Sequence, residues 1–281
     1  MKEELIIRSG WSTKMITLRT GEQVAFSLEA LEGVIEQVES EFIPLTVEHL
    51  GYLPPAGRLT GGRIITGEQG DSELFLTAET LPILPSSALT LQPSATEAGT
   101  VEEPTISSIR FSTEPRNFDK EGWEELQETA PLELTPHTAW STLPPIIWTI
   151  SLSVSGAVGI FGASFLKKLG DLSAEQLVDW LKAARAKTKD STRDQLVEVR
   201  FVTEDGTSIL GYCPVSVASE QSFVQLRTAL DGLEPLANFA ASVNAGRLPE
   251  ELRIVTFIFD EGRWRLAWWT TNESVRVTPW F

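Results

Sequence analysis

The sequence predicts an α+β protein in which two folded regions flank a long uncharged segment. Three observations favour this class. Short runs with alternating hydrophobicity occur in both halves, apolar residues at helical spacing follow Ser27 and Ser173, and residues 146–166 contain no charged side chain. With 281 residues, the chain is long enough for two domains that each bury their own core.

The N-terminal region is predicted to be β-rich with one helix. Ser27 is a typical N-cap residue, and the apolar residues of 28–38 recur at helical spacing, so a helix is expected that ends near Ser40. Residues 82–104 are rich in Pro, Ser and Thr and form a long loop. The strands expected here are at 42–47, 58–66, 72–78 and 105–112, and the middle two form a hairpin through GEQGD.

The region after the uncharged segment is predicted to be a ββαββ module. Ser173 and Gln176 have the spacing of a capping box, which begins a helix that ends near Lys189. Two hairpins are expected at 195–215 and 252–271, with helical sequence at 221–244 between them. The predicted domains are 1–118, an acidic linker at 119–145, the apolar segment 146–168, and the α/β module 169–281.

The uncharged segment permits two interpretations. As a helix it would be about 30 Å long, which matches the hydrocarbon core of a bilayer. Gly156, Gly159 and Ala163 would then let two membrane helices approach closely. Alternatively, 148–155 alternates apolar residues with Thr and Ser, as a half-buried strand does, and a core helix follows. We favour the first interpretation, with a lipid bilayer as a constitutive or conditional partner.

Charge and composition exclude several classes of function. The formal net charge of −16 argues against a nucleic-acid partner, because phosphate binding needs a basic surface. A single cysteine, Cys213, excludes internal disulfides, and two histidines, His49 and His137, leave little for metal chemistry. No metal or other cofactor is therefore expected. The first twenty residues lack the continuous apolar core of a secretory signal.

The N-terminal region contains four short motifs in the order IPLTVEH, PPAGRL, SELFLTAE and SSIRF. They resemble the viral prohead maturation proteases, serine endopeptidases of the herpesvirus-assemblin fold, over about residues 5–118. The resemblance implies that His49, at the end of the first motif, is the general base and that Ser108, in the last, is the nucleophile. Arg110 stands where that family has a glycine. From the residues alone, the favoured interpretation is that His49 is a surface or capping residue at the end of a strand and that Ser108 is an ordinary polar residue of a strand.

The whole layout is similar to that of bacterial signalling or defence proteins with a protease-like domain and an apolar segment that ends in ASFLKKLG. We therefore predict a membrane-associated bacterial effector or signalling protein, at the inner membrane or in the cytoplasm with conditional insertion. Its protease-like domain would bind or regulate a protein partner or another copy of the chain. Two alternatives stay open. One is an active serine endopeptidase that uses His49 and Ser108, self-processing or not, and the other is a soluble interaction protein with the apolar segment buried.

Overall fold

The structure is a computed structural model, and in the residues that it describes the chain is an α+β protein, as the sequence predicts. The chain divides into two compact units, which do not confirm the domain limits predicted at residues 118, 145 and 168. Unit 1 comprises Met1–Pro85 and Asn272–Val277, and unit 2 comprises Ser86–Thr271 and Thr278–Phe281. The residues described are 4–17, 23–46, 51–86, 105–136, 146–155, 174–216, 219–244 and 251–281.

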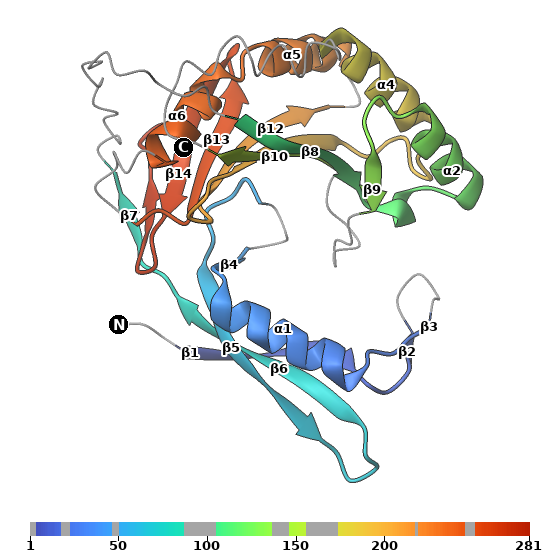
Figure 1. The fold of residues 1–281 in the computed structure, drawn as a ribbon, viewed down its shortest axis with the longest axis vertical. Helices are drawn as coiled ribbons and strands as arrows, with labels where there is room; N and C mark the ends of the chain where they lie inside the picture. The colour runs from blue at the N-terminus through green and yellow to red at the C-terminus, as the bar shows by residue number, and fades with distance from the viewer. Residues whose placement is uncertain are drawn as a thin grey trace. The chain divides into compact units, whose positions relative to one another are not determined.

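Unit 1 contains an antiparallel sheet with a helix on one face. The strand order is β1-β6-β5-β4, and α1 lies along the sheet in Figure 1. Leu31 and Val38 of the helix pack with Leu74 and Leu76 of β6 in a small hydrophobic core. The elements are β1 (Glu4–Ser12), α1 (Leu28–Ser40), β4 (Ile43–Leu45), β5 (Gly57–Thr66) and β6 (Ser72–Thr80).

The helix of unit 1 confirms the sequence prediction at both ends. The Ala30 amide donates a hydrogen bond of 3.1 Å to the Ser27 hydroxyl, which satisfies one of the amides that a helix leaves unpaired at its start. The helix ends at Ser40, and the Glu41 amide bonds the Gln37 carbonyl at 2.9 Å. Helical periodicity therefore located this element correctly.

Two short strand pairs complete unit 1. β2 (Ile16–Thr17) pairs antiparallel with β3 (Gln23–Val24), and β7 (Ile83–Pro85) pairs parallel with β15 (Val275–Val277). The last strand comes from the C-terminal end of the chain. Sequence analysis missed this pair, because strands of three residues carry too little periodicity to be recognised.

Unit 2 contains a mixed sheet in the order β14-β13-β12-β11-β10-β8-β9. In Figure 1, α4, α5 and α6 lie over one face of this sheet. The predicted ββαββ order is present, with the helical stretch divided into α5 and α6. The elements are β8 (Thr105–Thr113), the 3-10 helix η2 (Pro115–Asn117), α2 (Lys120–Thr129), β9 (Leu134–Pro136), β10 (Ile146–Ser155), α4 (Ala174–Ala186), β11 (Gln195–Val202), β12 (Ser208–Val215), α5 (Glu220–Asp231), α6 (Glu234–Asn244), β13 (Ile254–Asp260) and β14 (Arg263–Thr270).

A glycine lets α6 pack closely on this sheet. Gly211 lies on the helix-covered face of β12, where a Cβ atom would come within 2.4 Å of Leu236 Cδ2 and 3.0 Å of the Trp264 ring. Real Cβ atoms do not approach other carbons so closely, so a larger residue here would require the Leu236 side chain and the Trp264 ring to move.

The core of unit 2 is built around Trp148 of β10, which is fully buried. Its ring centroid lies 5.7 Å from that of Phe111, 5.8 Å from Phe118 and 5.4 Å from Trp180. The indole N–H donates to the Gln195 side-chain oxygen at 3.3 Å. Strands β8, β10 and β11, the segment before α2, and helix α4 are therefore held together by one aromatic cluster.

The prediction of a transmembrane helix at 146–168 is wrong. Ile146–Ser155 is strand β10, which pairs parallel with β11 and antiparallel with β8. The apolar residues of this strand lie in the protein core, where Ile146, Trp148, Ile150 and Leu152 are all buried. Within the described ranges, no helix combines the length and the apolarity that crossing a bilayer requires.

The error came from treating uninterrupted apolarity as a helical span. The alternation of apolar residues with Thr149 and Ser151 was the better guide, because side chains alternate between the two faces of a strand. Gly156, Gly159 and Ala163, which were predicted to pack membrane helices together, lie outside the described residues.

Trp148→Ala is expected to destabilise the protein by about 3–5 kcal/mol, because it leaves a large cavity among buried rings. The control is Val224→Ala on α5, where the side chain is 58% exposed and the change should stay within about 0.5 kcal/mol. Urea unfolding followed by circular dichroism measures both. Similar losses in the two variants would contradict the burial of β10.

Candidate functional site

The described residues do not bring the predicted catalytic pair together. His49 lies outside them, as does His137. Ser108 belongs to β8 of unit 2, where it pairs with Ser153 of β10. The assignment of His49 as base and Ser108 as nucleophile therefore stays a prediction.

Unit 1 offers a different candidate, beginning with a bulge in β1. The register of β1 against β6 shifts between Arg8 and Ser12. Gly10 lies in this bulge with φ +76°, a left-handed conformation that glycine adopts readily and other residues rarely do. The sequence of β1 alone does not reveal this bulge, because a bulge is defined by the partner strand as well as by its own residues.

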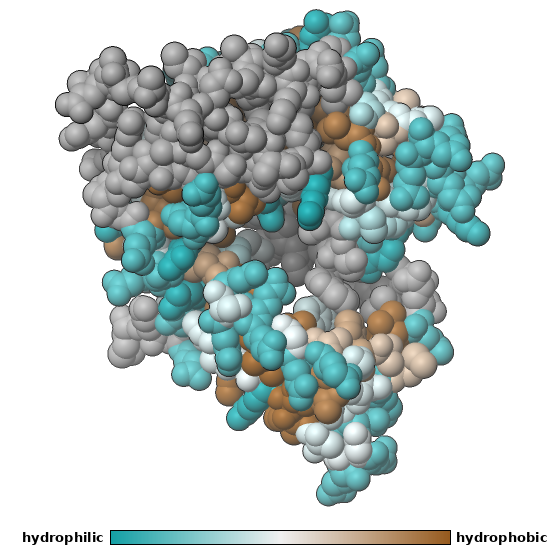
Figure 2. All heavy atoms as spheres, viewed as in Figure 1, coloured by the Kyte–Doolittle hydropathy of each residue, from teal (hydrophilic) through white to brown (hydrophobic). Residues whose placement is uncertain are grey.

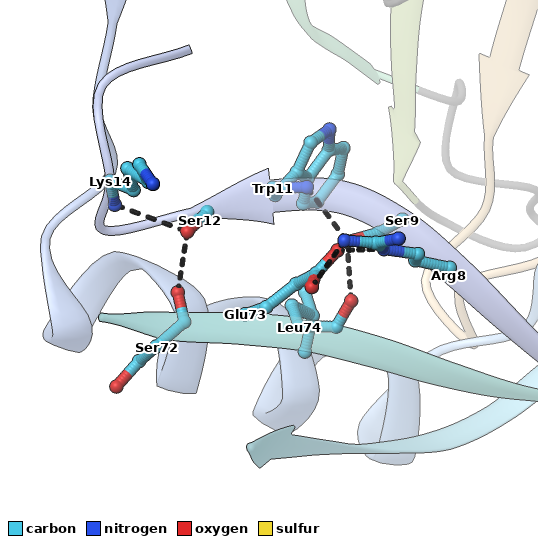
Figure 3. Close-up of polar contacts among 8 residues, drawn as sticks. All are labelled: Arg8, Ser9, Trp11, Ser12, Lys14, Ser72, Glu73 and Leu74. Carbon is cyan, nitrogen blue, oxygen red and sulfur yellow. Dashed lines mark hydrogen bonds and ion pairs between the residues drawn. The ribbon is translucent and has the colours of Figure 1, made fainter. Parts of the chain in front are cut away.

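At this bulge, two serine hydroxyls take the place of the regular backbone hydrogen bonds between β1 and β6 (Figure 3). Ser9 Oγ donates to the Leu74 carbonyl at 2.7 Å and accepts from the Trp11 amide at 3.0 Å. Ser12 Oγ donates to the Ser72 carbonyl at 2.8 Å. Both hydroxyl protons are therefore committed to backbone oxygens, and these serines support the backbone rather than act as nucleophiles.

A surface groove of about 440 Å³ lies beside the bulge. The segment after β1 contributes Lys14, and the β5–β6 hairpin contributes Ile65, Asp71 and Phe75. Phe75 alternates with the buried residues of β6, so the groove lies on the sheet face opposite α1. The groove thus combines apolar side chains with charges of both signs.

An ion pair forms part of the groove wall. Arg8 Nη2 lies 2.9 Å from Glu73 Oε2, and Arg8 Nε contacts the other carboxylate oxygen, as Figure 3 shows. The hydrogen bond to Glu73 raises the pKa of the Arg8 guanidinium. Arg8 and the exposed Arg63 are also the cross-strand partners of Phe75, one on each side. The phenyl ring is therefore placed between two cationic strand positions.

Two further charged side chains line the groove, Lys14 and Asp71. Neither the Lys14 ammonium nor the Asp71 carboxylate forms an ion pair with another residue that the structure describes. A bound molecule with both an acidic and a basic group would therefore find a partner for each.

The cysteine does not supply a nucleophile. Cys213 is buried on β12, and burial raises the pKa of its thiol to about 12. The thiolate is the reactive form, so the thiol is inert at neutral pH. Over the described ranges, no group of three or more His, Cys, Asp or Glu residues is placed to hold a metal ion.

Comparisons with known proteins were made at three levels. No protein-family model, no curated protein and no solved structure matches the chain. The function therefore has to be inferred from the residues and their contacts.

Ser9→Ala is expected to destabilise the protein by about 1–3 kcal/mol, because the Leu74 carbonyl and the Trp11 amide each lose a partner. The matched control is Thr60→Ala, which removes an exposed hydroxyl that contacts the Thr77 carbonyl at 3.4 Å and should change stability little. Thermal unfolding compares the variants, and an equal effect would refute the bulge support assigned to Ser9.

The Cys213 thiol should react very slowly with Ellman's reagent at pH 8 in the native protein, because little thiolate forms there. The same chain unfolded in guanidinium chloride should react rapidly, and it serves as the control. A native reaction rate close to the unfolded rate would show that Cys213 is accessible.

Proposed function

We propose that this chain is an interaction protein whose unit 1 binds a short peptide segment of a partner protein in the groove beside the β1 bulge. The observation that carries the proposal is the composition of this groove, which places apolar side chains between charges on a sheet face opposite α1. Peptide sites commonly pair an apolar anchor with a few polar contacts that set orientation. An interaction protein also agrees with the burial of Ile146, Trp148, Ile150 and Leu152 in the core of unit 2.

Exposed apolar residues support a docking role for unit 1. Ile6 is 59% exposed, Ile65 is 44% exposed, and Ile65 lines the groove. In Figure 2, brown side chains reach the surface of this unit beside the teal ones. A peptide with one aliphatic or aromatic side chain would cover Ile65 and Phe75 and remove their apolar surface from water.

The charges determine the rest of the expected peptide. An acidic residue beside the anchor would pair with Lys14, and a basic residue would pair with Asp71. The charge of Arg8 is already offset by Glu73, so Arg8 forms part of the groove wall and does not offer the peptide a free charge. The partner is therefore a segment with an apolar anchor and flanking charges, and the chain would act in signalling through it.

The resemblance to prohead maturation proteases is kept as a part of this proposal, as a protease-like chain that binds peptides without cleaving them. A fluorophosphonate probe separates this role from an active endopeptidase. We expect no labelling of the native chain, and trypsin serves as the positive control. Labelling that disappears in Ser108→Ala would instead establish the enzyme predicted from His49 and Ser108.

Panning short random peptides on the full chain should enrich sequences with an apolar residue next to an acidic one. Ile65→Glu should weaken the enriched peptides at least about tenfold, because it removes apolar contact and adds a charge. Lys14→Glu should reverse the preference for acidic residues. Fluorescence anisotropy with labelled peptides measures each affinity.

The matched control for the peptide experiment is Ile83→Glu. Ile83 is 57% exposed in unit 1 but does not line the groove, so this variant should bind as the wild type does. The proposal is wrong if panning enriches no such sequence, or if Ile65→Glu and Ile83→Glu bind the peptides equally well.

A further inference from the structure

A row of polar residues crosses three strands of unit 2. Arg110 of β8 is the cross-strand partner of Ser151 of β10, which in turn is the partner of Arg200 of β11. Cross-strand partners place their side chains on the same face of a sheet. The residues next to them, Phe111 and Ile150, belong to the helix-covered core, so the row lies on the opposite face.

This row is compact and runs from an exposed residue to two partly buried ones. Arg110 is exposed, Ser151 is half-buried, and the Arg200 side chain is 39% exposed. Adjacent strands lie about 4.8 Å apart, so the backbones of the two arginines are about 10 Å apart with Ser151 between them. Arginine side chains are long enough to converge on one group above the serine.

Arg200 is held in place by Glu198, which lies two residues earlier on the same face of β11. Its Nε and Nη2 atoms both lie 3.1 Å from Glu198 Oε1, and the Glu198 carboxylate is buried. Tyr212, the cross-strand partner of Glu198, hydrogen-bonds to the same carboxylate. Burial raises the pKa of the Tyr212 hydroxyl well above its usual range, so this group stays a donor. The guanidinium is therefore oriented before any ligand arrives.

This arrangement is costly if its purpose is only stability. Burying a carboxylate carries a desolvation penalty that its ion pair often fails to offset. An arginine whose orientation is set by two buried residues is instead typical of a site that recognises an anion. Such recognition depends on the direction of the paired N–H groups of the guanidinium. Glu133 precedes β9, the strand that pairs with the strand of Arg110, and it forms no ion pair with Arg110. The Glu133 carboxylate therefore does not neutralise the Arg110 guanidinium.

We propose that Arg110, Ser151 and Arg200 form a binding site for the phosphoryl group of a small phosphorylated ligand. The row presents two guanidinium groups and one hydroxyl. Glu198 offsets the charge of Arg200, so Arg110 supplies the positive charge of the site and Arg200 supplies oriented N–H donors. A tetrahedral phosphoryl group offers an oxygen to each of the three, whereas a carboxylate has only two oxygens. In the neighbouring row, Thr149 lies between Ser112 and Glu198. The hydroxyl-bearing residues Ser112 and Thr149 therefore lie beside the site. This site is independent of the peptide groove in unit 1.

Isothermal titration of the full chain with inorganic phosphate and with phenyl phosphate tests the site, at constant ionic strength. Acetate is the carboxylate control and should bind more weakly than either. Arg110→Gln should weaken phosphate binding at least about tenfold, since it removes a charge-assisted contact, and Ser151→Ala should weaken it by a smaller factor. Stronger binding of phenyl phosphate would identify a phosphate ester rather than free phosphate as the ligand.

The matched control is Arg263→Gln, an exposed arginine on β14 of the same unit that should bind phosphate as the wild type does. Arg200→Gln is avoided as the deciding variant, because it leaves buried Glu198 without its ion pair. The proposal is overturned if the wild type binds neither phosphate compound, if acetate binds as well as phosphate, or if Arg110→Gln and Arg263→Gln have equal affinities.

Discussion

Packing of one face of β10 against the helices is the interaction on which unit 2 depends. Ile146, Trp148, Ile150 and Leu152 are almost fully removed from water, and burial of each such side chain stabilises a protein by roughly 1.5–3 kcal/mol. The same strand supplies backbone hydrogen bonds to β8 on one side and β11 on the other. Its removal would expose the aromatic cluster and leave both neighbours with unpaired backbone groups.

The opposite face of β10 explains how a core strand can also form a binding surface. Because side chains alternate, the residues between these four point away from the helices, and they are Ile147, Thr149 and Ser151. Ser151 lies between two arginines that belong to different strands. In unit 1 the same alternation separates the α1-facing core from the groove, where Phe75 follows buried Leu74. Both candidate sites therefore lie on the sheet faces opposite the helices.

Local patterns in the sequence were enough to locate several elements. Ser27 and the spacing that follows it located α1, and the two hairpin turns located β11–β12 and β13–β14. These features depend on contacts between residues close in the chain, which a single sequence contains. The row of Arg110, Ser151 and Arg200 left no such signal, because its members come from three separate strands.

What the sequence by itself determined about this protein is its α+β class and the position of its regular helices and hairpins, since periodicity and capping are local properties. Only the tertiary structure decided that residues 146–155 are a strand with Ile146, Trp148, Ile150 and Leu152 in the core. An apolar run indicates that a segment is removed from water, but it does not indicate whether lipid or protein surrounds the segment. The groove and the arginine row likewise required the register between distant strands, such as the pairing of Arg8 with Phe75, which no local pattern encodes.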